Sequence, residues 1–118
     1  INMSEITLDH HLHSFGEGDV EAILEDYTEE STIIIPNTVI KGLDEIKDFF
    51  TNLVTEVLPP GCNFHLHDKV VMDNIAYLVW HADSDSYVVP FASDTFVFDE
   101  DDKIAVQTIA FVIQEKEE

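Results

Sequence analysis

The sequence predicts a single α+β domain, in which three helices precede a long antiparallel sheet. In the first half of the chain, apolar residues recur at helical spacing between glycine and proline breaks. From residue 63 onward, four long segments alternate apolar and polar residues instead. The 118 residues are 45% hydrophobic, which is enough for one core, and they contain no linker or internal repeat. We therefore expect one domain over residues 1–118.

Each helix is predicted from an apolar stripe and from the residues that bound it. Residues 6–15 carry apolar side chains three and four positions apart, and two glycines follow. Asp19 is a suitable N-cap for a short second helix. The third helix covers residues 42–57 and ends at the Leu-Pro-Pro-Gly segment 58–61, because proline cannot continue a helix.

The predicted strands are rich in β-branched and aromatic residues, and turn-forming residues separate them. Asp73-Asn74 separates two of the strands, and the acidic segment 99–102 separates two others. In chain order the strands are residues 32–36, 38–40, 63–72, 75–82, 87–98 and 104–113. The last four form a predicted antiparallel meander.

Both faces of the predicted sheet carry apolar side chains. A sheet that helices cover on one side only is usually polar on its other side. We therefore expect the outer face to pack against a second copy of the chain, as a homodimer. The residues expected at this contact are Leu78, Trp80, Val106, Ala110 and Val112.

One acidic residue interrupts the apolar strand 90–98. Alternate side chains of a strand share a face, so Ala92, Asp94, Phe96 and Phe98 point the same way. The two phenylalanines make this the expected core face. An ionised carboxylate there is costly unless it is paired, hydrogen-bonded or neutralised. The position of Asp94 therefore indicates a pocket or a buried polar network.

The net charge of the chain excludes some classes of binding partner. The sequence has 25 acidic and 5 basic residues, a formal charge of −20. Such a surface repels nucleic acid and anionic membranes, so we expect neither as a partner. All five basic residues are lysines, and without arginine the chain lacks the planar fork that captures phosphate groups. We expect a small, apolar, uncharged molecule as the ligand instead.

The location and cofactor predictions rest on features that the chain does not have. No apolar run is long enough to span a membrane, and the first residues do not resemble a secretion signal, so we expect a cytoplasmic protein. Cys62 is the single cysteine, so it is expected to be an inert thiol without an internal disulfide. We expect no cofactor.

Three segments resemble the nuclear transport factor 2-like superfamily, which includes ketosteroid isomerases and SnoaL-like polyketide cyclases. Residues 18–27, Gly-Asp-Val-Glu-Ala-Ile-Leu-Glu-Asp-Tyr, are similar to its second helix. Residues 40–46, Ile-Lys-Gly-Leu-Asp-Glu-Ile, are similar to the entry into its third helix. Residues 94–100, Asp-Thr-Phe-Val-Phe-Asp-Glu, are followed by Lys-Ile at 103–104 as in that superfamily.

The resemblance implies a cystatin-like cone: an α+β roll with three N-terminal helices on a strongly curved mixed or antiparallel sheet, and a pocket between them. It places Asp94 where the isomerases keep a protonated acid that donates a hydrogen bond to an oxyanion. His11 falls where they place a tyrosine. The position of their base, just before Pro36, holds Ile35, which cannot take a proton. Epoxide hydrolases of the superfamily use an arginine, and this chain has none.

Asp94, His11 and His81 are the candidates for catalysis, because a histidine facing an acid in an apolar cavity forms a general acid–base pair. His11 lies on the apolar side of its helix, which also fits a plain core histidine. His81 takes part only if its face of the strand is the pocket face. The residues expected to contact a ligand are Tyr27, Tyr77, Phe96, Gln107, Ile109 and Phe111.

The remaining histidines raise the question of a metal site. His10 and His13 have a spacing that suits a metal on a helix. His65 and His67 share the face of a strand opposite its apolar residues, which are Phe64, Leu66, Val70 and Met72. That places the two histidines outside the core, and no nearby carboxylate completes a set. We therefore expect no metal site.

Three functions fit these observations. The first is an enzyme that moves a proton on a small apolar substrate, as an isomerase, cyclase or dehydratase does. The second is a non-catalytic binder of a small hydrophobic molecule. The third is a dimerisation module whose pocket is vestigial. We rank the enzyme first by a small margin and keep the other two as alternatives, because one fold hosts many functions and Ile35 cannot act as a base.

Overall fold

The computed structural model describes residues 1–117. The helices are α1 (Met3–Glu17), α2 (Val20–Leu24) and α3 (Gly42–Asn52), and a π-helical segment, η1 (Leu53–Val57), continues α3. The strands are β1 (Tyr27–Ile35), β2 (Thr38–Lys41), β3 (Asn63–Met72), β4 (Ile75–Asp83), β5 (Tyr87–Phe98), β6 (Ile104–Phe111) and β7 (Gln114–Glu115). The α+β class predicted from the sequence is confirmed.

The strands form one mixed sheet in the order β2-β1-β6-β5-β4-β3, and β7 pairs with the first residues of β5. Among these pairs only β1 and β6 run parallel. The long connection that a parallel pair requires is provided by the elements between them, which include α3 and the first strands of the meander. β1 begins at Tyr27, earlier than the predicted start at residue 32, so Tyr27 is a strand residue. The last predicted strand ends at Phe111 rather than at Ile113.

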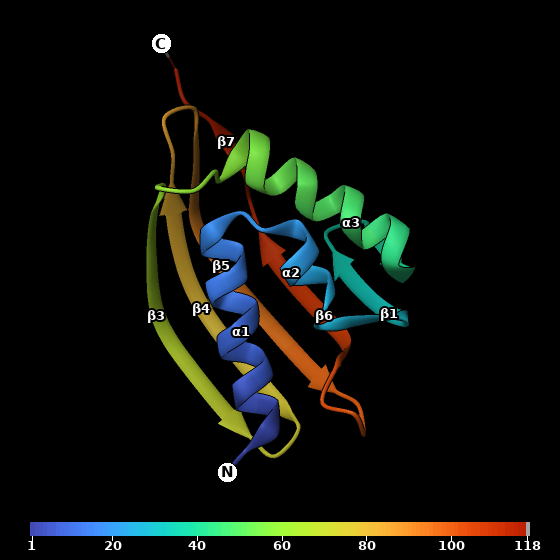
Figure 1. The fold of residues 1–118 in the computed structure, drawn as a ribbon. Helices are drawn as coiled ribbons and strands as arrows, with labels where there is room; N and C mark the ends of the chain where they lie inside the picture. Colours follow the sequence, from blue (N-terminus) through green and yellow to red (C-terminus); the bar gives the residue numbers. More distant parts are fainter. Residues whose placement is uncertain (118) are drawn as a thin grey trace.

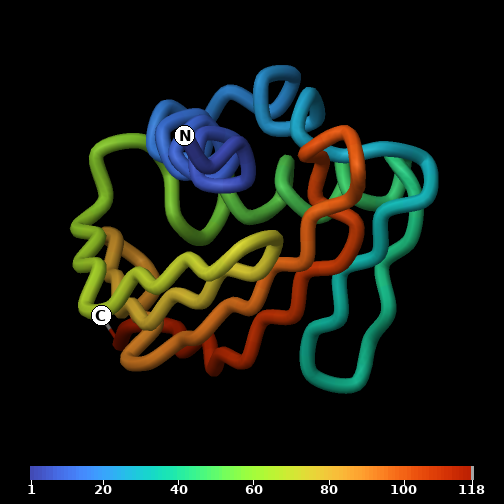
Figure 2. The backbone as a smooth tube through the Cα atoms, turned by 90° about the horizontal axis from the view of Figure 1, so that it is seen from below, coloured from blue at the N-terminus to red at the C-terminus, as the bar shows by residue number. Residues whose placement is uncertain are grey.

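All three helices lie on the same face of the curved sheet (Figures 1 and 2). α1 contacts β4, and α3 contacts β1 and β2. The sheet and the helices therefore enclose a core, as in the cone-shaped roll that the resemblance implies. No helix within residues 1–117 has the length and hydrophobicity to cross a membrane.

Specific residues fix the turn between α1 and α2. Asn2 caps the first turn of α1, and Asp19 caps α2 as predicted. Gly18 ends α1 with a φ of +66°. A Cβ atom at this position would lie 2.6 Å from Cγ of Pro60, so the loop before β3 packs directly on the glycine.

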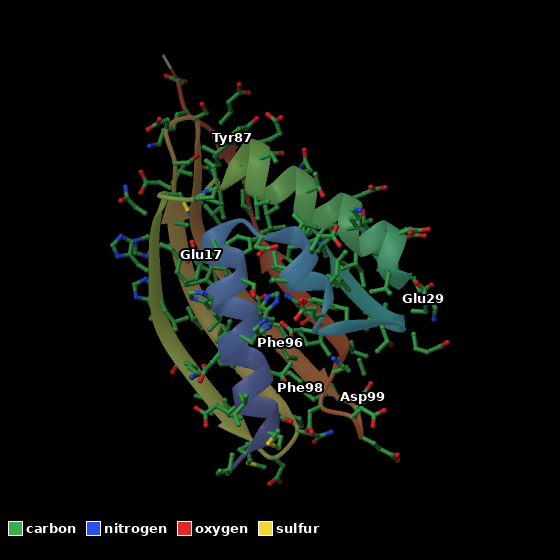
Figure 3. All side chains as sticks on the ribbon, viewed as in Figure 1. Glu17, Glu29, Tyr87, Phe96, Phe98 and Asp99 are labelled. Carbon is green, nitrogen blue, oxygen red and sulfur yellow. The ribbon has the colours of Figure 1, made fainter. Side chains whose placement is uncertain are left out.

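The inward face of β5 is the predicted one. Ala92, Asp94, Phe96 and Phe98 are all buried, and the residues between them are half-buried on the other face. In Figure 3 the labelled Phe96 and Phe98 lie between α1 and the sheet. The labelled acidic residues Glu29 and Asp99 lie toward the edge of the molecule in this view, and Glu17 lies at the C-terminal end of α1.

The inner and outer faces predicted for β4 were the wrong way round. Leu78 and Trp80 were expected on the outer face, but both are buried in the core, at 2% and 6% exposure. Tyr77 and His81 consequently point outward. The reason is that the indole of Trp80 finds a buried hydrogen-bond acceptor in Asp94, which the apolar pattern alone does not reveal.

A β-bulge in β3 changes the face of the residues beyond it. The register with β4 shifts at His67, just after Leu66. Phe64 and Leu66 share the inner face, as predicted. Val70 and Met72 were also expected on the core face but point outward, where 50% and 67% of their surfaces are exposed.

The outer face of the sheet remains apolar. Val106, which was expected at a dimer contact, is half-buried, while Ala110 and Val112 are exposed. Further exposed apolar side chains on this face are Ile34, Val70, Met72, Ile75 and Tyr77. Leu78 and Trp80 take no part in this face.

Candidate functional site

Asp94 lies in the middle of β5 on the face that the helices cover, with 6% of its surface exposed. Its Oδ1 accepts a hydrogen bond from the indole N–H of Trp80 at 2.8 Å, and its Oδ2 accepts one from Nε2–H of Gln107 at 2.8 Å. The register explains both contacts. Leu78 lies opposite Asp94 and Phe96 lies opposite Gln107, so Trp80 and Gln107 are the diagonal neighbours of Asp94.

Burial is the main influence on the charge of Asp94. It raises the pKa of this carboxyl group to about 6, although the hydrogen bonds from Trp80 and Gln107 act in the opposite direction. At neutral pH the group is therefore mostly ionised, and both of its oxygens accept N–H donors. A protonated, donating acid, as the resemblance implies, does not match this arrangement.

A third hydrogen bond extends the network to β1. The hydroxyl of Tyr27 donates to Oε1 of Gln107, and both side chains are almost fully buried. Burial, followed by the negative charge of Asp94, raises the pKa of Tyr27 well above its ordinary value. Tyr27 is therefore a neutral donor. The chain Tyr27–Gln107–Asp94–Trp80 joins four neighbouring strands, β1, β6, β5 and β4.

His11 reaches the same region from α1. Its ring packs edge-on against the rings of Tyr27, Phe50 and Phe96, with centroids 5.8, 5.7 and 5.5 Å away. Burial, followed by repulsion from His10, lowers the pKa of His11 to about 4, so the imidazole is neutral at physiological pH. Its Nδ1 is the only buried side-chain nitrogen or oxygen within residues 1–117 that lacks a hydrogen-bond partner.

A small apolar cavity lies against Asp94 and His11. Its volume is about 30 Å³, which is enough for about one water molecule. Its walls come from α1, α3, η1 and the inner face of the sheet. The cavity in this structure is therefore much smaller than a typical ligand pocket.

The outer wall of this cavity consists of side chains that are only partly covered. Leu12 and Phe15 of α1, Phe64 of β3 and Phe111 of β6 form it, and Phe64 is 38% exposed. A second apolar hollow, of about 90 Å³, shares the first three of these residues and extends to Cys62. The two hollows thus adjoin each other at these three side chains.

A larger hollow, of about 440 Å³, lies elsewhere on the molecule. It is open and polar, and Asp83, Ser84, Asp85 and Lys116 are among the residues that line it. It shares no residue with the cavity at Asp94. We therefore take the smaller, apolar cavity as the candidate site.

Most of the residues predicted for the site meet at this cavity. Asp94, His11, Gln107, Ile109 and Phe111 line it. Tyr27 and Phe96 lie directly behind it, in contact with the ring of His11. Residues that the sequence analysis did not select are Leu12, Phe15, Phe50, Leu53, Phe64, Leu78 and Trp80. For Trp80 a signal existed, since a buried indole N–H needs an acceptor and a buried carboxylate needs donors.

His81 and Tyr77 are not part of this site, because both lie on the outer face of the sheet. His81 stacks between His65 and His67, at ring-centroid distances of 4.5 and 4.6 Å. Reduced hydration, followed by repulsion from His65 and His67, lowers the pKa of His81. Within residues 1–117, no three histidine, cysteine or acidic side chains are arranged to hold a metal ion.

A curved mixed sheet with three helices on its inner face defines the nuclear transport factor 2-like class of folds. Within this class the chain belongs to the family of SnoaL-like domains, which matches residues 8–107. None of the curated proteins is similar enough to count as a relative.

Solved structures share this fold over almost the whole chain. The epoxide hydrolase/cyclase-like enzyme SalBIII, which has a role in pyran ring formation in the polyether salinomycin, is 19% identical, with a TM-score of 0.77 over 96% of this chain and 95% of that chain. A putative SnoaL-like polyketide cyclase from Shewanella denitrificans OS-217 is 12% identical, with a TM-score of 0.75 over 95% and 92%. An NTF2-like protein of unknown function from Cytophaga hutchinsonii ATCC 33406 is 12% identical, with a TM-score of 0.74 over 92% and 89%. At these identities the likeness shows the fold alone.

Proposed function

We propose that this protein is an enzyme that moves a proton on a small, largely apolar, uncharged substrate, with Asp94 as the group that takes and returns the proton. The observation that carries this proposal is the buried Asp94 at an apolar cavity, with a pKa of about 6. A base works best when its pKa lies near the working pH. Asp94 meets this condition and is ionised at neutral pH.

The chemistry follows from the two groups at the cavity. Asp94 removes a proton from a carbon next to a carbonyl group, the C–H bond breaks, and its electron pair moves to the carbonyl oxygen as an enolate. The negative charge thus passes from Asp94 to the substrate, and the new carboxylic acid returns its proton to the same or another atom. His11 is a neutral imidazole, and its N–H can donate to the oxygen on which charge develops.

His11 supports this proposal independently of Asp94. A buried polar atom without a partner is costly, and proteins keep such atoms mainly where a ligand or water satisfies them. The unpartnered Nδ1 of His11 belongs to a ring that lines the same cavity as Asp94. A substrate with one polar group would pair with this ring and place its apolar part against the surrounding phenylalanines.

Substrate entry requires the outer wall of the cavity to move, because the present space holds about one water molecule. Phe64 is the side chain best placed to move, since it is partly exposed and lies in β3, the edge strand of the sheet. Family membership is consistent with the proposal. One structurally similar protein is described as a putative SnoaL-like polyketide cyclase, and another as an epoxide hydrolase/cyclase-like enzyme.

The small cavity also favours a second candidate function, a dimerisation module with a vestigial pocket. Ile35, which the resemblance places at the position of the isomerase base, does not line the cavity. The two functions differ in one measurable property. A protein with a vestigial pocket does not catalyse proton exchange of any small molecule.

Proton exchange in heavy water tests the enzyme without knowledge of its natural substrate. Cyclohexanone and 2-cyclohexen-1-one are suitable probes, because each is small, uncharged and apolar except for one carbonyl group. We expect the protein to speed the replacement of their α-hydrogens by deuterium, as seen by NMR. Asp94→Asn should abolish this acceleration, and His81→Asn, a matched change on the opposite face, should not. Equal exchange with the wild type and with Asp94→Asn would exclude Asp94 as the base.

We also propose that two copies of the chain associate through the outer face of the sheet. This face carries exposed apolar side chains on a protein whose formal charge is −20. Exposed apolar patches of this kind usually mark an interaction surface. The contact would include Val106, Ala110 and Val112, but not Leu78 and Trp80, which are buried in the core.

A further inference from the structure

The orientation of the Gln107 side chain depends on the protonation states of its two neighbours. The amide of a glutamine has an N–H₂ group that only donates and an oxygen that only accepts. Here Oε1 accepts from the hydroxyl of Tyr27, and Nε2 donates to Oδ2 of Asp94 at 2.8 Å. Gln107 is 1% exposed, and Tyr27 and Asp94 are the side-chain partners of its amide.

This orientation fits only an ionised Asp94. A carboxylate has no proton and accepts from both Trp80 and Gln107. When Asp94 takes up a proton, its O–H needs an acceptor. Trp80 offers only a donor, and Nε2 of Gln107 offers only donors. The protonated acid would therefore face two N–H groups and no acceptor among its present partners.

We propose that Gln107 is a rotating amide relay for Asp94: it presents its N–H₂ group to the ionised carboxylate and its carbonyl oxygen to the protonated acid. Rotation of the amide by half a turn exchanges its two ends. The O–H of Asp94 then donates to Oε1 of Gln107, and Nε2–H of Gln107 donates to the hydroxyl oxygen of Tyr27. The hydroxyl proton of Tyr27 has to turn away from Gln107 in this state.

The relay makes Tyr27 a positioning residue for Asp94, although the two side chains share no hydrogen bond. In the ionised state the Tyr27 hydroxyl has an acceptor in Gln107, and in the protonated state it gives this acceptor up. The hydroxyl therefore favours the amide orientation that stabilises the carboxylate. Tyr27 thus holds Asp94 in the form that accepts a proton, through Gln107 alone.

The other side chains around Asp94 and Gln107 are mostly apolar. β4 contributes Leu78 and Trp80 beside Asp94, β6 contributes Gln107 and Ile109, and α3 contributes Phe50 to the same cavity. The titratable side chains that face this region are Tyr27 from β1 and His11 from α1, and Asp26, which is paired with His10, acts on Tyr27 through its charge. Tyr27 and His11 are both neutral at physiological pH, because burial raises the pKa of Tyr27 and lowers that of His11.

The relay deepens the proposed function, and its catalytic meaning rests on that function. A base at a buried apolar cavity must change charge without leaving a buried polar group unpaired. The relay supplies a partner for Asp94 before and after it takes the proton from the substrate. The amide rotation itself is independent of any substrate, so it can be measured on the free protein.

Side-chain NMR of the wild-type protein between pH 5 and pH 8 tests the rotation directly. Above the pKa of Asp94, the Gln107 amide protons should show NOEs to the side chains of Asp94 and Trp80. Below it, they should show NOEs to the ring of Tyr27. The midpoint of this change should coincide with the titration of the Asp94 carboxyl carbon. Amide protons that keep the same contacts across this range would overturn the relay.

A double-mutant cycle tests the role of Tyr27. Tyr27→Phe should raise the pKa of Asp94 by about half a unit to one unit, since it removes the hydroxyl that favours the ionised state. In a Gln107→Leu background the same change should shift the pKa of Asp94 by less than about 0.2 units. Tyr77→Phe, on the outer face, is the matched control and should have no effect. An equal shift with and without Gln107 would show that Tyr27 acts directly and would refute the relay.

These measurements separate the relay from the proposed function. If the amide rotates with pH but the ketone probes do not exchange, the relay stands and the enzyme assignment fails. If the probes exchange but the amide does not rotate, Asp94 is a base without a relay. Poor folding of Gln107→Leu leaves the wild-type titration as a complete test.

Discussion

Replacing Asp94 with asparagine should stabilise the protein at neutral pH, because this carboxylate is buried at a cost. The pKa of Asp94 is about 6 in the folded protein, against an ordinary value of 3.8. Between these values the folded protein binds more protons than the unfolded chain. Stability therefore falls as the pH rises through about 4 to 6, and the penalty is complete above this range. Asparagine carries no charge and does not incur it.

The size of the effect follows from the pKa difference. A rise of about two units, at about 1.4 kcal/mol per unit, corresponds to about 3 kcal/mol at pH 8. At pH 5 the same relation gives about 1.6 kcal/mol, because the folded protein still holds most of the proton. The stability gain of Asp94→Asn over the wild type should thus grow by about 1.4 kcal/mol between pH 5 and pH 8. Asparagine has nearly the same shape as aspartate. Its amide oxygen can still accept from Trp80, and its N–H₂ group can donate to Gln107 once that amide turns its oxygen toward it.

Urea unfolding of both proteins at pH 5, 6, 7 and 8 measures this difference. Asp83→Asn is the matched control, because Asp83 is only half-buried at the edge of the core and its hydrogen bond with Lys116 lowers its pKa. It should give no gain that grows with pH. A pH-independent difference between wild type and Asp94→Asn would refute the reasoning. So would a loss of stability that increases toward pH 8.

Three further predictions concern other parts of the structure. Gly18→Ala should destabilise the fold by about 1–3 kcal/mol in urea unfolding, because φ is +66° there and the new Cβ would meet Pro60; an unchanged midpoint would contradict this. Phe64→Ala should widen the cavity and raise the rate of ketone exchange at low probe concentration, and a lower rate would argue against entry at this wall. Val112→Lys should dissociate the proposed dimer in analytical ultracentrifugation, whereas an unaffected dimer would exclude this face as the contact.

The position of Asp94 could be predicted because alternation in β5 is unambiguous. Phe96 and Phe98 mark one face as apolar, and Asp94 shares it. The same rule gave the wrong face for β4. In β4 both faces carry apolar side chains, Leu78 and Trp80 on one and Tyr77 and Val79 on the other. Alternation shows which residues share a face, but it does not show which face points inward.

The hydrogen-bond network could not be predicted from the sequence, for a different reason. It depends on which residues of neighbouring strands are diagonal partners, and this is set by the register. Leu78 lies opposite Asp94, which makes Trp80, two residues along β4, a diagonal neighbour of Asp94. Phe96 lies opposite Gln107, which makes Gln107 a diagonal neighbour of Asp94 in β6. The bulge at His67 is equally a property of the paired strands. No single strand carries these signals.

The pKa of Asp94 is the quantity on which the proposed function depends most. It can be read from the pH dependence of the side-chain carboxyl carbon of this residue in a ¹³C NMR titration of the free protein. The structure predicts a midpoint of about 6. A midpoint near the ordinary value of 3.8 would contradict the account, because it would place this carboxylate in a hydrated surface rather than in an apolar cavity.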